Sequence, residues 1–302
     1  MKLEFKTPEL SDAEWAVPHI LNANITACDY NFANIFLWRD VYRHKICFTG
    51  GMLLVKTDGV LGEAFLFPIG NGDLEHALKV MKSQRHNLDT KLTLVCVTEE
   101  NKIRLDEIFP GRFEFIENID YQDYVYSADK LAELAGKKLH SKRNHINKFI
   151  EGCSSWSFEK LCDENTSECR DLMSRWMQEK IDDGSSRKFL SDEMPVVMNI
   201  LNYRRELNIC GGVLRVNGEV TAFSAGCLLN GTCFDVIAEK ADRHIPGCYA
   251  VINREMSKMV RDMYPDVKWI NREDDMGLEG LRKSKQSYFP DIMIKKYTAI
   301  EK

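Results

Sequence analysis

Hydrophobic and polar residues alternate most regularly between residues 209 and 271, and this stretch predicts a sheet with one helix packed on it. The dipeptides Asn217-Gly218 and Asn230-Gly231 are strong signals for two-residue hairpin turns. They separate three segments with strand-like alternation: Gly211–Val216, Glu219–Leu229 and Thr232–Ala238. The pattern therefore predicts a three-stranded antiparallel meander.

After this meander the spacing of apolar residues changes from that of a strand to that of a helix. Beyond a loop, apolar residues recur at spacings that place them on one face of a helix. They are Ile252, Met256, Met259, Val260 and Met263. Pro265 ends the helix, and the run from 267 to 270 predicts another strand. The order is strand, strand, strand, loop, helix, strand.

The loop before this helix is a candidate anion site. A glycine stands at the mouth of the helix, and residues 246 to 253 contain no acid, so backbone N–H groups could face a phosphate. A helix that begins after a plain Pro-Gly turn explains the same pattern. The strand order resembles the core of the Gcn5-related N-acetyltransferases, in which such a loop holds the pyrophosphate of coenzyme A. The resemblance implies that the anchor is formed by Arg243, Pro246, Gly247, Cys248, Tyr249 and Ala250.

The N-terminal half repeats the order more weakly, with strands around Gly50-Gly51, a helix after Asp73, and further strands and a helix up to residue 117. We therefore expect an α/β (α+β) fold with mixed sheets, built as two tandem acetyltransferase-like domains at 1–126 and 127–302. The last strand, Met293–Thr298, is expected to close the second sheet. The first domain lacks a loop like Pro246-Gly247, so we expect the second to carry the active site.

Residues 137–148 join the halves and form a basic amphipathic helix. Five lysines and arginines and two histidines lie between Glu133 and Glu151, with no acid among them. The patch suits phosphates of RNA or of a cofactor, through Lys138, Lys142 and Arg143. A solvated helix face is the alternative, and a membrane-surface helix fits less well because the apolar stripe is narrow. A further segment, 181–188, is rich in Asp, Gly and Ser and predicts a loop.

Acids and bases alternate directly after the strand that ends at residue 270. Such charges are costly to hold together unless they pair with one another or with a ligand. A salt-bridged surface loop and a ligand site both explain them. The candidate binding residues here are Asn271, Arg272, Asp274, Arg282, Lys283 and Lys285.

Composition narrows the classes of function. The chain has 302 residues, 44% of them hydrophobic, and a net charge of −5, so the whole molecule is not a polyanion-binding protein by charge. No apolar run reaches the roughly 20 residues of a membrane helix. We expect a cytoplasmic protein without integral membrane contact. The ten cysteines form no Cys-x-x-Cys pair, which favours reduced core thiols and predicts no metal site.

Three segments together resemble a known family. They are GKKLHSKRNHINKF from Gly136, the loop Glu239–Ala250, and NREDDMGLEGLRKSKQSY from Asn271. They are similar to the soluble C-terminal domain of the lysylphosphatidylglycerol synthases. The resemblance implies tandem acetyltransferase-like domains, akin to the aminoacyl-tRNA-dependent transferases that build peptidoglycan cross-bridges. Since no membrane domain precedes this unit in the sequence, a small-molecule or peptide acceptor is expected rather than a phospholipid.

The expected reaction is acyl or aminoacyl transfer by direct attack in a ternary complex. The donor is aminoacyl-tRNA or acyl-coenzyme A, and no tightly bound cofactor is expected. The candidate catalytic residues are Asp235, Glu239, Glu273 and Tyr288. Asp235 and Glu239 precede the loop, and the strand order brings them towards the residues after 270. The alternative of another class is a non-catalytic RNA- or protein-binding module on a transferase fold.

Overall fold

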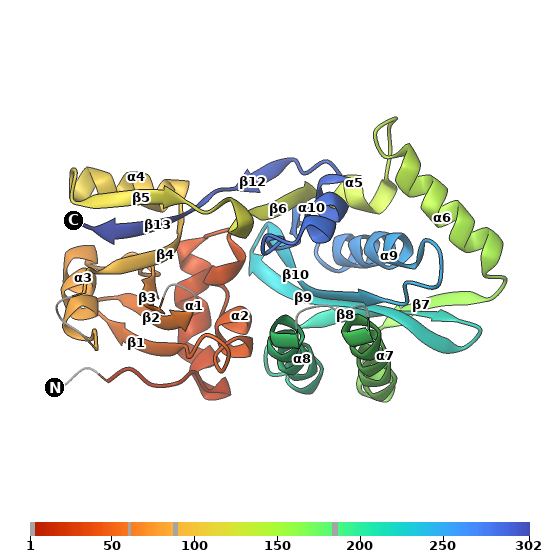
Figure 1. Ribbon diagram of the computed structural model, residues 1–302, viewed down its shortest axis with the longest axis horizontal. Coiled ribbons are helices and arrows are strands. Elements are labelled where there is room, and N and C mark those ends of the chain that lie inside the picture. The colour runs from red at the N-terminus through yellow and green to blue at the C-terminus, as the bar shows by residue number, and fades with distance from the viewer. Residues whose placement is uncertain (1–3, 60–61, 87–89, 183–186) are drawn as a thin grey trace. The chain divides into compact units, whose positions relative to one another are not determined.

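The computed structural model describes residues 4–59, 62–86, 90–182 and 187–302, with the side chains of 187–191 excepted. Its contacts divide the chain into two compact units (Figure 1). The first unit contains residues 1–124, 273–282 and 292–302, and the second contains 125–272 and 283–291. The chain therefore returns to its first unit twice after leaving it. The domain boundary expected after residue 126 lies near the first passage from one unit to the other, and the later passages were not expected.

The first unit is built on a six-stranded sheet in the order β1-β2-β3-β4-β13-β5. The hairpin predicted at Gly50-Gly51 joins β1 to β2, and both glycines have positive φ angles, 57° and 77°. Asp73 caps α3 by accepting a hydrogen bond from the His76 N–H, as its position before the helix predicts. The strands are β1 Lys45–Thr49, β2 Met52–Gly59, β3 Gly62–Leu66, β4 Thr93–Thr98, β5 Phe113–Glu117 and β13 Lys296–Glu301; the helices are α1 Ala13–Ala23, α2 Phe32–Leu37, α3 Leu74–Ser83 and α4 Glu99–Ile108, with 3-10 turns at Leu10–Asp12, Cys28–Tyr30 and Ile119–Tyr121.

The second sheet has seven strands in the order β12-β6-β11-β10-β9-β8-β7. The predicted meander is confirmed as β8, β9 and β10, with antiparallel pairing throughout. The strands are β6 Asp123–Ser127, β7 Trp156–Lys160, β8 Cys210–Val216, β9 Glu219–Asn230, β10 Cys233–Ala241, β11 Trp269–Asn271 and β12 Ile292–Ile294; the helices are α5 Ala128–Glu133, α6 His140–Gly152, α7 Asp163–Asp182, α8 Arg187–Asn202, α9 Cys248–Met263 and α10 Glu279–Gln286. Four residues of the loop predicted at 181–188, residues 183–186, lie outside the described part of the chain.

Helix α9 packs its apolar face against the second sheet. Ile252, Met256, Met259 and Val260 from the predicted stripe are buried, while Met263 at the end of the helix is 38% exposed. Helix α9 contacts β8, β9 and β10, and α5 and α6 pack against α9. The 3.6-residue period of this stripe thus predicted both the helix and the face that it buries.

The prediction for the last strand is wrong. Residues 293–298 do not form one strand of the second sheet, because the chain breaks there into β12 and β13. Strand β13 pairs antiparallel with both β4 and β5 in the first sheet. Its apolar residues Tyr297 and Ala299 are buried there, and Lys296 is wholly buried as well. Alternation marks residues 296–301 as a strand, but it does not say which sheet they join.

The two sheets share one plan. In each, a run of antiparallel strands, β1 to β3 in the first sheet and β7 to β10 in the second, is followed by a parallel neighbour, β4 or β11. A helix connects the parallel strands, α3 in the first unit and α9 in the second. The next strand is antiparallel, β13 in the first sheet and β6 in the second. The fold is mixed α/β, with two tandem domains built on the same plan.

Candidate functional site

Strands β10 and β11 separate after a short parallel pairing, and the gap between them organises the second unit. Their register ends with Asp235 opposite Asn271, whereas β10 continues to Ala241. In the first unit, β3 and β4 likewise pair only through Phe65 and Leu66. Backbone groups that face such a gap need other partners.

In the first unit a side chain closes the corresponding gap. The Tyr30 hydroxyl donates to the Cys96 carbonyl of β4 at 2.9 Å and accepts from the backbone of Phe67, just past β3. Tyr30 is fully buried, and this burial raises the pKa of its hydroxyl. The hydroxyl thus takes the position where the next strand-to-strand hydrogen bond would form, so this gap is filled from within.

A β-bulge decides which residues face the gap in the second unit. On β10, Asp235 lies opposite Cys227 and Glu239 lies opposite Ser224, so four steps on β10 match three on β9. Side chains alternate between faces along a strand, and one extra residue reverses the alternation. Asp235 and Glu239, both predicted as candidate catalytic residues, therefore point to opposite faces of the sheet. Glu239 points to the face covered by α9.

Glu239 forms a buried ion pair with Arg272. The Arg272 Nη2 lies 2.9 Å from the Glu239 Oε1, and the two side chains are only 10% and 9% exposed. Asn253 of α9 donates its amide to the other carboxylate oxygen at 3.2 Å. The two residues therefore join the ends of the separating strands, as the strand order suggested, and Glu239 accepts hydrogen bonds from both Arg272 and Asn253. The Glu239 carboxylate raises the pKa of Arg272 against the opposing effect of burial.

Several buried polar atoms around this ion pair lack a hydrogen-bond partner among the described residues. They are the Ser224 Oγ, the Asn253 Oδ1 and the Arg272 Nη1. Ser224 lies opposite Glu239 in the register of β9 and β10, and Asn253 and Arg272 contact its carboxylate. Buried polar groups are normally satisfied, so their concentration around one carboxylate indicates a site for a polar ligand group or for water. Sequence reasoning missed Ser224 and Asn253; the available signal was a polar residue inside an otherwise apolar segment.

Two cations face the ring of Tyr288. The Lys142 Nζ lies 4.0 Å from the ring centre, and the Arg272 guanidinium carbon lies 5.0 Å from it. Tyr288 is 4% exposed, and burial raises its pKa to about 12, so it is a neutral phenol. Burial, and then the nearby Arg272 charge, lower the pKa of Lys142 to about 8. The aromatic face offsets part of the repulsion between two such cations.

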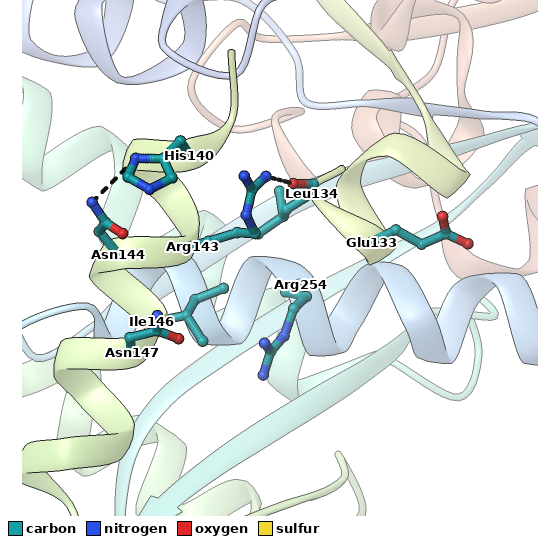
Figure 2. A pocket seen from close by; sticks show the side chains of 8 residues that line it. All are labelled: Glu133, Leu134, His140, Arg143, Asn144, Ile146, Asn147 and Arg254. Atoms are coloured by element: carbon teal, nitrogen blue, oxygen red, sulfur yellow. Dashed lines mark hydrogen bonds between the residues drawn. The ribbon is translucent and has the colours of Figure 1, made fainter. Parts of the chain in front are cut away.

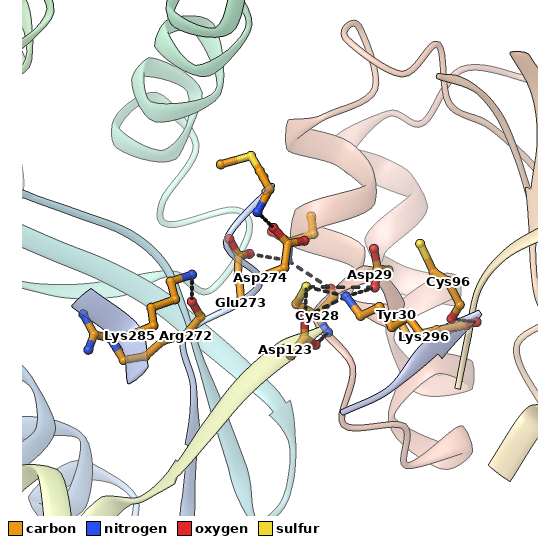
Figure 3. Close-up of polar contacts among 12 residues, drawn as sticks. Cys28, Asp29, Tyr30, Cys96, Asp123, Arg272, Glu273, Asp274, Lys285 and Lys296 are labelled. Atoms are coloured by element: carbon orange, nitrogen blue, oxygen red, sulfur yellow. Dashed lines mark hydrogen bonds and ion pairs between the residues drawn. The ribbon is translucent and has the colours of Figure 1, made fainter. Parts of the chain in front are cut away.

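Lys285 supports this arrangement from α10. Its buried ammonium donates to the Arg272 carbonyl (Figure 3), and its own carbonyl accepts from the Tyr126 hydroxyl at 2.7 Å. Lys285 thus holds the backbone of Arg272. Arg272, Lys142, Tyr288 and Lys285, all predicted as site residues, are therefore brought together.

The loop before α9 has a different environment from the expected phosphate cradle. Gly247 has φ of 84°, and a Cβ atom there would lie 2.0 Å from the His145 carbonyl oxygen of α6. The Cys248 N–H donates to the Ile245 carbonyl, and the Ala250 N–H donates to the Gly247 carbonyl. The close approach that requires a glycine is therefore the approach of α6.

The side chains of this loop also have partners within the unit. Arg243 pairs with Glu179 of α7 at 3.2 Å. The Tyr249 hydroxyl accepts from the Trp176 indole N–H at 3.1 Å. Cys248 is buried, which raises the pKa of its thiol to about 12, while Pro246 is exposed and Ala250 is buried. Among the predicted anchors of a pyrophosphate, Arg243 and Tyr249 contact α7, and Gly247 lies against α6.

The acids and bases from residue 273 to residue 282 lie in the first unit. Glu273 accepts from the Asn34 amide at 3.0 Å, and Asp274 accepts from the Met276 N–H (Figure 3). Arg282 forms ion pairs with Asp275 at 2.8 Å and with Asp120 at 2.6 Å. Of the two interpretations of this segment, the salt-bridged loop is therefore the one that fits Arg282. Lys283 is exposed on α10 in the second unit.

A polar pocket lies beside the basic helix α6 (Figure 2). Arg143 points towards the end of α5, where it donates to the carbonyls of Leu134 and Gly136. Arg143 therefore caps a helix end. Lys138 lies 5.6 Å from the ring of Phe289. The residues that line the pocket are Glu133, Leu134, His140, Arg143, Asn144, Ile146, Asn147 and Arg254.

The first unit contains a buried charged cluster that sequence reasoning missed. The Lys296 Nζ lies 2.5 Å from Asp29 and 2.6 Å from Asp123, and Lys296 and Asp123 are wholly buried (Figure 3). Cys28, Asp29 and Asp123 place a sulfur and two oxygens close enough together to hold a metal ion. The Lys296 ammonium lies between the two carboxylates, so it supplies their positive charge. The neighbouring carboxylates raise the pKa of Lys296, whereas burial alone would lower it.

Comparison with known proteins identifies the family. Residues 22–300 match the family described as "Phosphatidylglycerol lysyltransferase, C-terminal". The chain belongs to this family. The resemblance seen in the sequence is therefore confirmed, and the lysyltransferase C-terminal family is an aminoacyl- or acyltransferase family.

Solved structures agree with the family fold. A conserved protein of unknown function from Bacteroides thetaiotaomicron is 33% identical, with a TM-score of 0.92 over 99% of this chain and 100% of that chain. The structure of L-PGS from Bacillus licheniformis gives 0.68 at 14% identity, over 100% and 94%. A tandem GNAT protein from the clavulanic acid biosynthesis pathway gives 0.50 at 11%, over 99% and 98%. The last two likenesses concern the fold. Among the described residues, none of the helices has the length and apolar character needed to span a bilayer.

Proposed function

We propose that the second unit transfers an acyl or aminoacyl group from a phosphate-containing donor to an amine or hydroxyl acceptor. The reaction takes place at the gap between β10 and β11. The observation that carries this proposal is the family match over residues 22–300 together with the buried polar set around Glu239 and Arg272. The first unit serves as a structural partner, because Tyr30 fills its corresponding gap.

The residues at the gap have separate roles in this proposal. The Arg272 Nη1 is buried and has no hydrogen-bond partner among the described residues, and it binds negative charge of the donor. Glu239 orients Arg272 and is a positioning residue. The acceptor nitrogen or oxygen attacks the carbonyl carbon, the bond from carbon to the donor oxygen or sulfur breaks, and the acceptor proton passes to the leaving atom.

Aminoacyl-tRNA is the donor that we favour. Its support is the family match and the basic stretch 137–148, in which Lys138 is exposed. Acyl-coenzyme A is the other donor of the same chemical kind. The acceptor that we propose is a small molecule or a peptide with a free amine or hydroxyl.

The test is a transfer assay that uses radiolabelled aminoacyl-tRNA and acetyl-coenzyme A in parallel, with a panel of amine and hydroxyl acceptors. Loss of label from the donor should depend on the protein and should fall at least a hundredfold in Arg272→Lys. Label transferred from coenzyme A alone would identify the donor as acyl-coenzyme A. Binding of tRNA without turnover by any donor would reject transfer in favour of an RNA-binding module.

A further inference from the structure

Lys142 has an unusual environment for a lysine. Its ammonium is partly buried above the ring of Tyr288, and it forms no hydrogen bond or ion pair with any described residue. The other cation over the same ring is Arg272, whose Nη2 binds Glu239 and whose Nη1 is buried and has no partner within the described part of the chain. Two cations thus lie against one aromatic ring, and the Glu239 carboxylate is already paired with Arg272.

This arrangement is costly without a ligand. Like charges that share a partly buried site repel each other, and desolvation adds to the cost for each cation. A lysine on the surface of a helix could turn its flexible side chain towards water, and instead this one lies against Tyr288. An anion placed against the ammonium and the Arg272 Nη1 would satisfy both groups at once.

We propose that Lys142 and Arg272 form a two-point subsite for one phosphate group of the donor, with the Tyr288 ring as its floor. The subsite rests on the proposed function and specifies where the donor is held. It replaces the loop at Gly247 as the phosphate anchor, because the His145 carbonyl occupies the approach to that glycine. The Arg272 edge offers one free nitrogen and Lys142 offers a point charge, which suits a tetrahedral oxyanion better than a planar carboxylate.

The subsite has a pH signature. In the free protein the pKa of Lys142 is lowered to about 8 by burial and by Arg272, while Glu239 raises it slightly and Tyr288 is a neutral phenol. A bound oxyanion favours the charged ammonium. Affinity should therefore be constant below pH 8 and should fall by up to about tenfold for each pH unit above it, because binding then requires proton uptake.

Sulfate is the probe for this test, because its charge stays constant across this pH range. Binding is measured from the sulfate dependence of thermal unfolding at fixed ionic strength. We expect the parent protein to show the fall above pH 8. Lys142→Met, which keeps the apolar stem over Tyr288, should bind about tenfold more weakly or worse. Lys142→Arg should bind sulfate with no fall up to pH 10, because arginine does not titrate there.

The matched control is Lys148→Met, which removes an exposed lysine of the same helix and should leave sulfate binding unchanged. Equal sulfate binding by the parent and Lys142→Met would overturn the subsite, as would a parent affinity that is flat above pH 8. Acetate binding as tightly as sulfate would also overturn it, by showing a carboxylate site. The transfer assay is run on the same variants. Turnover that survives in Lys142→Met, together with unchanged sulfate binding, would remove this subsite and leave the proposed function standing.

Discussion

The carbonyl oxygen of His145 lies 2.0 Å from the position that a Cβ atom on Gly247 would occupy. This contact explains the glycine at the mouth of α9 without a ligand. Helix α6 passes so close to the loop that no side chain fits, and the backbone there has a φ of 84°, which L-residues rarely adopt.

Replacing Gly247 should therefore destabilise the protein. We expect Gly247→Ala to lower the free energy of unfolding by about 3 kcal/mol, from backbone strain and from displacement of α6. Gly136→Ala is the control, since Gly136 has the same φ of 84° but no atom within 4 Å of the added Cβ. It should cost only about 1 kcal/mol. Equal losses in urea unfolding would show that the contact with His145 has no effect.

The local pattern of the chain predicted much of this fold, because local signals act through neighbouring residues. The hairpin at Gly50-Gly51, the meander around Asn217-Gly218 and the stripe on α9 all follow from turn chemistry and periodicity. The repeated order of elements, with the family resemblance, predicted two tandem domains. Strand β13 could not be assigned in this way, since its partners β4 and β5 lie about 200 and about 180 residues away along the chain.

The site shows the same limit at the level of single residues. Strand order suggested that Glu239 and Arg272 meet, and they do, while their roles stay predictions. The bulge between Val236 and Ala238, which turns Asp235 to the other face, leaves no turn signal in the sequence. In the sequence, Asn253 and Ser224 are isolated polar residues in apolar elements. Their proximity to the Glu239 carboxylate is a tertiary relationship, which local patterns do not show.

Removing one partner of the ion pair between Glu239 and Arg272 should lower the free energy of unfolding. Arg272→Met leaves a buried carboxylate without its charge partner, and we expect a loss of about 3–5 kcal/mol in unfolding free energy. Glu239→Gln in the same chain should restore part of that loss, because it removes the unpaired charge. A double-mutant cycle by chemical denaturation measures this coupling. Additive losses would contradict a direct interaction.

Lys296 should be essential for the stability of the first unit. Its removal leaves Asp29 and Asp123 without the ammonium between them, so Lys296→Met is expected to cost about 3–5 kcal/mol. The neighbouring Lys295→Met is the control, because that side chain is 52% exposed and its ion pair with Glu117 is long, at 3.6 Å. It should change stability by less than about 1 kcal/mol. Similar melting temperatures for the two variants would rule out a structural role for the cluster.

The lowered pKa of Lys142 should appear in the pH dependence of stability. Its ordinary pKa is 10.5 and its pKa in the folded protein is about 8, through burial and then Arg272, with Glu239 opposing. Between these values the unfolded chain binds more protons than the folded one, so this lysine makes stability rise with pH. Below pH 8 both states are protonated and the full cost of burying the charge is present.

Relative to Lys142→Met, the parent should therefore gain about 1–2 kcal/mol between pH 8 and 10.5, after allowance for solvent screening. Urea unfolding of both proteins across this range measures the difference. A constant difference would show that Lys142 keeps an ordinary pKa, and the cost of an empty anion subsite would then be absent.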